Sequence, residues 1–149
     1  MFKKILVGID GSEMGDKAFS TALNLAKEWG AKIFLAHVMP MPTLPNVFPP
    51  GAIAYVPEGV LDELIKEIRD KAEKTLRERL QKAQAAGVEG EIKVLKGEAA
   101  SALVGFAQEE GIELIVVGSR GISGVKELML GSVSHKVSQL AKCPILIVK

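Results

Sequence analysis

Residues 112–132 read IELIVVGSRGISGVKELMLGS, and this stretch decides the fold. Its apolar start, 112–117, is typical of a buried strand, and the residues after the stretch have the spacing of a helix. Between them, three glycines follow the pattern G-x2-G-x9-G at Gly118, Gly121 and Gly131. Glycine lets a backbone approach a ligand closely, and the first amides of a helix carry partial positive charge. The stretch therefore predicts an anion site, most simply for phosphate.

Two better-known phosphate-binding patterns are missing from the sequence. A Walker A loop requires G-x4-G-K-[ST], and no glycine of this chain is followed by a lysine and a hydroxyl residue. A dinucleotide fingerprint requires G-x-G-x-x-G after the first strand. The first strand-like run, 3–10, ends instead in the turn GIDGS at 8–12. The predicted phosphate site therefore belongs to a different class of loop.

The composition excludes several classes of function. The chain has 149 residues, which suits one domain, and its net charge of +1 gives no electrostatic reason to bind nucleic acid or an anionic membrane. No uncharged apolar run reaches the roughly 18 residues of a membrane helix, and the run after Lys4 meets Asp10 too soon for a signal peptide. The single cysteine, Cys143, allows no intrachain disulfide and no cage of thiolates around a metal. We therefore expect a cytoplasmic protein that binds neither nucleic acid nor membranes.

Strand-like and helix-like patterns alternate along the chain. Apolar runs predict five strands, and apolar residues spaced by three and four predict the helices between them. The predicted strands are 3–10, 32–38, 91–96, 112–118 and 144–149. The predicted helices run from Ser12 to Gly30 and over 58–86, 99–110 and 132–141.

This alternation predicts a single-domain α/β fold with an open, parallel five-stranded sheet and helices on both faces. About 98% of the crossovers in such sheets are right-handed. Two strand orders are reasonable, 3-2-1-4-5 and 2-1-3-4-5. Ligands of open α/β sheets bind where the order reverses, outside the carboxyl ends of the strands. The order 3-2-1-4-5 brings the turn at 8–12 beside Gly118, so that two candidate sites coincide. We favour that order for this reason.

The segment 39–57 has a different composition from the rest of the chain. It contains six prolines and no charged side chain, and it is too long for an ordinary connection. We expect a long, apolar, proline-rich loop. Two interpretations stay open: a lid or partner contact, and a loop packed against its own domain.

Charged and titratable residues near the predicted site have simpler interpretations. His37 lies in an apolar strand, where a histidine is more often a packing residue than a base. Arg120, Lys126 and Lys136 are close enough to approach a phosphate, and we interpret them as surface charges. Neither His37 nor His135 has an identifiable serine or carboxylate partner, so the sequence gives no catalytic triad.

At these residues the chain resembles the universal stress protein family, in its nucleotide-binding branch. The resemblance covers essentially the whole chain. It rests on KKILVGIDGSE at 3–13, on HV at 37–38, on the G-x2-G-x9-G-S segment and on CPILIVK at 143–149. It implies a Rossmann-like domain, similar to the adenine nucleotide alpha hydrolases, with order 3-2-1-4-5 and ATP at the switch point. It also implies a role in regulation or stress survival, with catalysis absent or slow.

Carried onto this sequence, the resemblance implies a nucleotide site of ten residues. Those near the base and the ribose are Gly8, Ile9, Asp10, Val38 and Gly118. Those at the phosphates are Gly121, Gly131, Ser132, Val133 and Ser134. A magnesium ion would bridge phosphate oxygens without a ligand from a protein side chain.

The last predicted strand, 144–149, suggests how two chains would associate. It would lie at the edge of the sheet with four consecutive apolar residues at 145–148 and only Lys149 as a guard. An unprotected apolar edge invites pairing with another chain. We therefore expect a twofold homodimer through this strand, which the family resemblance also implies.

Two other functions stay open beside ATP binding. One is a slow ATPase or an adenylate-using enzyme with the same pocket. The related adenylating enzymes have an SGGxDS loop after the first strand, and VGIDGSE stands there instead. The other is a dimerisation scaffold without ligand, which the intact glycine pattern disfavours.

Overall fold

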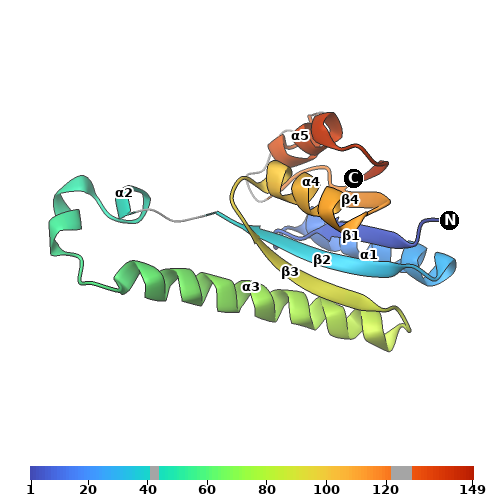
Figure 1. Ribbon diagram of the computed structural model, residues 1–149, viewed down its shortest axis with the longest axis horizontal. Coiled ribbons are helices and arrows are strands. Elements are labelled where there is room, and N and C mark those ends of the chain that lie inside the picture. The colour runs from blue at the N-terminus through green and yellow to red at the C-terminus, as the bar shows by residue number, and fades with distance from the viewer. Residues whose placement is uncertain (41–43, 122–128) are drawn as a thin grey trace.

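A parallel five-stranded sheet forms the centre of the molecule (Figure 1). The computed structural model describes residues 1–40, 44–121 and 129–149. The strands are β1 (Lys4–Gly8), β2 (Lys32–Met39), β3 (Gly90–Lys96), β4 (Leu114–Gly118) and β5 (Ile145–Val148). They lie in the order β3-β2-β1-β4-β5, so the predicted α/β class and the preferred order 3-2-1-4-5 are confirmed.

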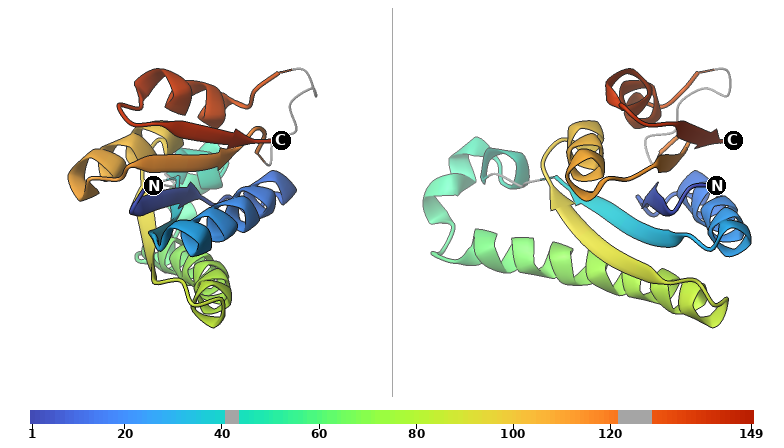
Figure 2. Two further views of the ribbon diagram at one scale, coloured as in Figure 1. Left: turned by 90° about the vertical axis from the view of Figure 1, so that its right-hand side faces the viewer. Right: turned by 45° about the vertical axis from the view of Figure 1, so that its right-hand side comes forward.

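Helices cover both faces of this sheet (Figure 2). On one face lie α1 (Glu13–Trp29) and α3 (Val60–Ala85), and on the other lie α4 (Ala99–Glu110) and α5 (Ser132–Leu140). Successive residues of a strand point to opposite faces. Ile5 and Val7 of β1 therefore enter one core and Leu6 enters the other, and all three are fully buried. Burial on both faces explains why the central strands are apolar at nearly every position.

The strand order reverses at β1, which pairs with β2 on one side and β4 on the other. Helix α1 crosses the sheet close to the end of β4. A Cβ built on Gly118 would lie 2.8 Å from the carbonyl carbon of Met14 in the first turn of that helix. Gly118 is thus required by the contact between helix and strand, in addition to any role beside a ligand.

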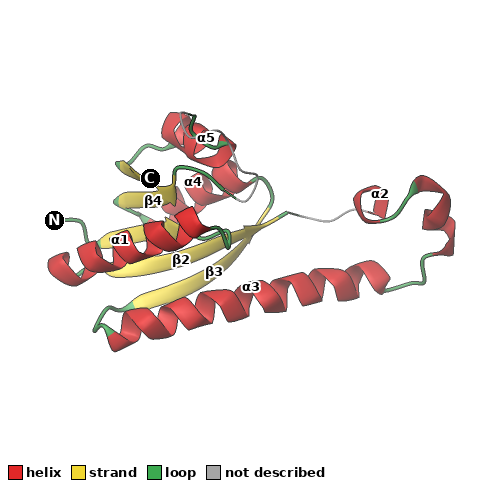
Figure 3. Cartoon of the chain, turned by 180° about the vertical axis from the view of Figure 1, so that it is seen from behind, coloured by secondary structure: helices red, strands yellow, loops and turns green. Residues whose placement is uncertain are grey.

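The proline-rich segment 39–57 is not the loop that we expected. It contains two short helices, α2 (Leu44–Val47) and η1 (Pro50–Tyr55). Proline suits the first turn of a helix because its φ is already fixed near the helical value and its missing N–H would have no partner there. Figures 1 and 3 show both helices beyond the end of the sheet, on the same side as the start of α3.

The length of α3 carries this segment past the sheet. The helix has 26 residues, about 39 Å, whereas the adjoining strand β3 has seven, about 23 Å. Its buried residues, Ala72, Leu76 and Ala83, all lie between the middle of the helix and its end. No residue of η1 is buried, and Tyr55 is 86% exposed. The residues of η1 therefore do not fit the interpretation of a loop packed against its own domain.

The contact at Gly118 leads to a stability prediction. Gly118→Ala should lower the free energy of unfolding by about 1–3 kcal/mol, the usual cost of overpacking, because the new methyl group meets helix backbone that has little room to move. Urea denaturation measures the change. Gly105→Ala is the matched control: a Cβ there meets nothing within 4 Å inside α4, so it should raise stability by roughly 0.4–1 kcal/mol. Equal effects of the two variants would contradict this account of Gly118.

Candidate functional site

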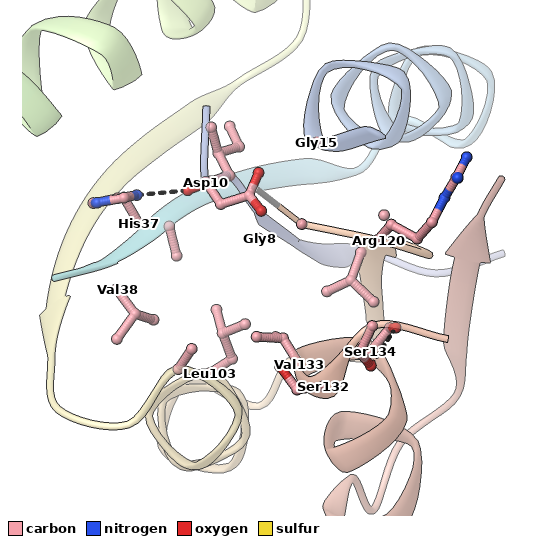
Figure 4. A pocket seen from close by; sticks show the side chains of 17 residues that line it. Gly8, Asp10, Gly15, His37, Val38, Leu103, Arg120, Ser132, Val133 and Ser134 are labelled. Atoms are coloured by element: carbon pink, nitrogen blue, oxygen red, sulfur yellow. Dashed lines mark hydrogen bonds between the residues drawn. The ribbon is translucent and has the colours of Figure 1, made fainter. Parts of the chain in front are cut away.

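A cavity of about 260 Å³ lies at the carboxyl ends of β1, β2 and β4, where the strand order reverses. Figure 4 shows it between these strand ends and the starts of α4 and α5. All ten predicted site residues line it: Gly8, Ile9, Asp10, Val38, Gly118, Gly121, Gly131, Ser132, Val133 and Ser134. Their role in binding a nucleotide remains a prediction. The other lining residues are Gly15, Ala36, His37, Ala99, Leu103, Val117 and Arg120.

The start of α5 faces this cavity, and no side chain among the described residues caps it. Gly131 precedes the helix, and its carbonyl accepts the first helical hydrogen bond from the His135 amide at 2.9 Å. The amides of the next three residues, 132–134, consequently have no acceptor within the helix. No acidic residue stands in the first turn to offset the positive end of the helix dipole. This helix start therefore offers unpaired donors and partial positive charge to the cavity.

The two other helix starts near the cavity are already occupied by side chains of the protein. Ser12 accepts a hydrogen bond from the Gly15 amide at 3.0 Å and caps α1. Glu98 accepts from the amides of Ala100 and Ser101 at 3.3 and 2.8 Å and caps α4. No described side chain occupies the start of α5 in this way, so that start is open to an anion as far as residues 1–40, 44–121 and 129–149 are concerned.

Glu98 is held in its charged form by the groups that it caps. Hydrogen bonds from Ser101 are the main cause that lowers its pKa to about 2, with smaller contributions from Lys136 and the Ala100 amide. Lys136 of α5 lies 3.3 Å from the Glu98 carboxylate. The two helices are thus linked by an ion pair, and Lys136 is a surface charge, as expected. Lys126, interpreted in the same way, lies outside the described residues.

The hydroxyl group of Ser134 is not available to a ligand as a donor. Ser134 is 2% exposed. Its Oγ lies 3.0 Å from the carbonyl oxygen of Ser119 and 3.1 Å from that of Gly131, so the single hydroxyl hydrogen is used within the protein. The predicted phosphate contact of Ser134 is therefore restricted to its backbone amide.

Gly131 lies where the end of β4 and the start of α5 come together. Its amide donates to the Ser119 carbonyl at 2.7 Å. A Cβ at Gly131 would approach Arg120 Cα at 3.2 Å and the Ser119 carbonyl oxygen at 3.3 Å. Its φ of −64° is open to any residue. We expected this glycine to clear a path for phosphate, and the structure shows that it is also needed for the close contact with the end of β4.

Asp10 is held in a turn at the border of the cavity. Its Oδ1 accepts from the Ser12 amide at 2.9 Å and from the Ser12 hydroxyl, which makes it a turn-forming residue. Its Oδ2 would lie 2.8 Å from a Cβ on Gly121. The carboxylate therefore borders the glycine segment and the cavity while the turn holds it in place.

Two cavity residues were interpreted from sequence as having no part in the site. The ring nitrogen Nδ1 of His37 lies 2.7 Å from the carbonyl oxygen of Ile9, and the residue lines the cavity (Figure 4). Arg120 also lines it, although Figure 4 shows its guanidinium group directed away from Ser132. The position of His37, next to Val38 at a strand end, was the signal in the sequence that pointed to the site.

Metal ligands and membrane spans are not found in the part of the chain that the structure describes. In residues 1–40, 44–121 and 129–149, no three His, Cys, Asp or Glu side chains are grouped to hold a metal ion. Within the same ranges, none of the helices has both the length and the apolar character needed to cross a membrane.

The comparison with known proteins identifies the family. The model of the universal stress protein family matches residues 1–149. The chain belongs to the universal stress protein family. It is 48% identical to universal stress protein YxiE of Bacillus subtilis over the full length of both chains. It is 31% identical to universal stress protein MJ0531 of Methanocaldococcus jannaschii, and that alignment covers 100% of this chain and 83% of the relative.

Solved structures of the family have the same fold. Universal stress protein UspA from Lactobacillus plantarum superposes with a TM-score of 0.83 at 23% identity, and the match covers 99% of this chain and 98% of the other. A universal stress protein in complex with cAMP superposes with a TM-score of 0.66 at 29% identity, covering 99% and 97%. The family resemblance and the fold inferred from the sequence are thus confirmed.

The cap at Glu98 leads to a prediction about pH. Because its pKa is lowered to about 2 in the folded protein, the cap contributes stability above the unfolded value near pH 4.3 and loses it as pH falls toward 2. Glu98→Gln, which mimics the protonated form, should be less stable than the wild type at pH 7, and the difference should shrink between about pH 4.5 and 2. Urea denaturation at several pH values measures it. A difference that stays constant with pH would show that the charge of Glu98 does not matter.

Proposed function

We propose that this chain binds an adenine nucleotide, ATP with Mg²⁺, and acts as a homodimeric, nucleotide-binding regulatory protein of the stress response. The observation that carries the proposal is the uncapped start of α5, which opens onto a cavity at the switch point of the sheet. Anions bind at such helix starts because unpaired amides point at them and the helix dipole favours negative charge. A nucleotide combines phosphates with a base, and the base would fit the apolar part of the cavity.

The lining of the cavity has a separate region for each part of a nucleotide. Ala36 and Leu103 provide an apolar environment for a base beside the backbone of Val38. Asp10 lies between that region and the glycine segment, within the reach of a ribose hydroxyl. The phosphates would lie at the amides of 132–134. One universal stress protein of known structure, 29% identical to this chain, is a complex with cAMP, which supports an adenine nucleotide as the ligand.

The contacts are strong enough for useful affinity. A hydrogen bond to a charged group is worth about 1.5–3 kcal/mol, so three amides on phosphate oxygens give roughly 5–9 kcal/mol before the costs of ordering. Burial of a base adds about 25 cal/mol for each Å² of apolar surface. Micromolar binding requires about 8 kcal/mol. The site therefore needs no P-loop lysine.

The residues present also suit a magnesium ion bound through the phosphates. Mg²⁺ keeps several waters and needs only one or two carboxylates beside phosphate oxygens. Asp10 is the acidic side chain among the cavity residues given above. When bound, the ion would neutralise phosphate charge, and the helix amides would then hold the remaining oxygens.

A single amide can be removed from α5 to test the phosphate contact. Ser132 is the first residue of the helix, where proline is tolerated, and the preceding Gly131 has the extended backbone that proline prefers before it (φ −64°, ψ 159°). Ser132→Pro should weaken MgATP binding by about 10- to 100-fold, the loss of one hydrogen bond to a charged oxygen. Isothermal titration calorimetry measures the dissociation constant.

Ser132→Ala is the matched control, because it removes only the exposed hydroxyl group and keeps the amide. It should bind MgATP less than about fivefold more weakly than the wild type, with the thermal midpoints of both variants close to that of the wild type. If Ser132→Pro binds MgATP as the wild type does, the phosphates do not contact this amide. If the wild-type protein binds no adenine nucleotide, the proposed function is wrong.

The proposed homodimer uses the open edge of β5. The strand pairs with β4, and the carbonyls of Pro144 and Val148 accept from Ile115 and Ser119 of that neighbour. Backbone groups of a strand alternate between its two sides, so those of Ile145 and Ile147 face outward. Two copies related by a twofold axis would pair these groups and cover an edge that would otherwise invite aggregation.

Proline at position 147 tests this pairing while leaving the contact with β4 intact. Ile147→Pro removes an N–H that faces outward, a place where proline is accepted in an edge strand, and should convert the dimer to a monomer in sedimentation velocity. Ile147→Ala is the control, since it removes the same apolar side chain but keeps the N–H, and should remain dimeric. A dimeric Ile147→Pro variant would place the interface elsewhere.

A further inference from the structure

The hydrogen bonds between β1 and β2 follow a regular series that stops one bond early. Lys32 donates to the Lys3 carbonyl at 2.9 Å, and Ile9 donates to the Ala36 carbonyl at 2.8 Å. In a parallel pair the series continues with every second residue. The next bond would run from the Val38 amide to the Ile9 carbonyl, and no hydrogen bond joins these two described residues.

His37 takes the place of that missing bond. Its Nδ1 lies 2.7 Å from the Ile9 carbonyl oxygen (Figure 4). A carbonyl only accepts hydrogen bonds, so Nδ1 must carry the proton and donate. The neutral ring is thereby fixed as the tautomer with its hydrogen on Nδ1. The Ile9 carbonyl is satisfied by a side chain instead of by the neighbouring strand.

The consequence is a free pair of backbone groups on β2. The alternation that turns Ala36 toward β1 turns the N–H and C=O of Val38 to the same side, past the end of β1 at Gly8. Within residues 1–40, 44–121 and 129–149, no backbone group pairs with Val38 there. Val38 lines the cavity, so a donor and an acceptor lie together at its wall.

We infer that His37 is a positioning residue for the nucleotide site: its Nδ1–H occupies the Ile9 carbonyl and so keeps the backbone of Val38 free for the base. This inference rests on the proposed function. Adenine offers the complementary pair, since N7 accepts and the N6 amino group donates on one edge, whereas guanine presents two acceptors on that edge. Without the imidazole, the Val38 amide would close onto the Ile9 carbonyl, and a base would have to break that bond to enter.

Three substitutions of His37 separate the effect of the Nδ1 hydrogen bond from the effect of the rest of the ring. Asparagine carries its amide nitrogen at the position of Nδ1, glutamine carries it near the position of Nε2, and leucine has neither. His37→Leu and His37→Gln should bind MgATP at least about tenfold more weakly than the wild type, and His37→Asn should stay within about threefold, because it alone keeps a donor on the Ile9 carbonyl. Titration calorimetry of all four proteins gives this comparison.

Exchange of the Val38 amide hydrogen with solvent gives a measurement that a loss of side-chain packing at His37 would not change. In the wild type without nucleotide, the Val38 amide should exchange rapidly with solvent, and MgATP should protect it. In His37→Leu the same amide should be protected before any ligand is added, because it pairs with Ile9. Hydrogen–deuterium exchange followed by NMR measures both states.

The wild-type protein alone provides a third test, which does not depend on how the variants fold. Nitrogen NMR of the His37 ring should show hydrogen on Nδ1 at neutral pH. Hydrogen on Nε2, a Val38 amide protected without ligand, or MgATP affinity in His37→Leu equal to that of the wild type would each overturn the inference while leaving nucleotide binding intact. Failure of the wild type to bind MgATP would instead overturn the proposed function, and the role of His37 with it.

Discussion

Ser119 is the point on which the arrangement of the site depends. Its amide donates to the Val148 carbonyl of β5 at 2.7 Å, and its carbonyl accepts from the Gly131 amide at 2.7 Å and from the Ser134 hydroxyl group. One buried residue thus fixes the end of β4 against β5 and brings the start of α5 back to the same place. These bonds fix the start of α5, so an anion at its first amides would be held by backbone geometry rather than by a charged side chain.

The same geometry explains why an anion would bind at the start of α5 rather than at the starts of α1 and α4. A helix start satisfied by Ser12 or Glu98 has no donors to spare, and Glu98 adds a negative charge that repels phosphate. In the part of the chain that the structure describes, no side chain caps α5, and its first turn has no acidic residue. Its first amides are left to water, which a bound phosphate would replace as their acceptor. Binding of such a ligand would then stabilise the folded chain.

Much of this architecture could be predicted from the sequence because it depends on local patterns. Apolar runs locate the strands. Two strand orders are reasonable for such a parallel sheet. The order that brings Gly118 beside the turn at 8–12 is the observed one. The ten predicted site residues lie together for the same reason. Other features depend on contacts between distant residues. The clash that excludes a side chain at Gly118 involves Met14, and the bond of His37 depends on where β1 ends. The two short helices in 39–57 were not predicted because prolines usually end helices, although proline fits the first turn of a helix.

The unequal lengths of neighbouring strands finally explain where the cavity can form. β1 ends at Gly8 opposite Ala36, whereas β2 continues to Met39 because β3 pairs with it to the last residue. On its other side, the backbone groups at the end of β2 would normally pair with a strand or bind water. Here the carbonyl of Ile9 bonds to the ring of His37, and the starts of α4 and α5 line the opposite side of the cavity. A strand edge with free backbone groups, a helix start with free amides and an apolar wall consequently meet in one hollow. Backbone groups thus make up much of the hollow, and the side chains of Asp10 and His37 lie beside them.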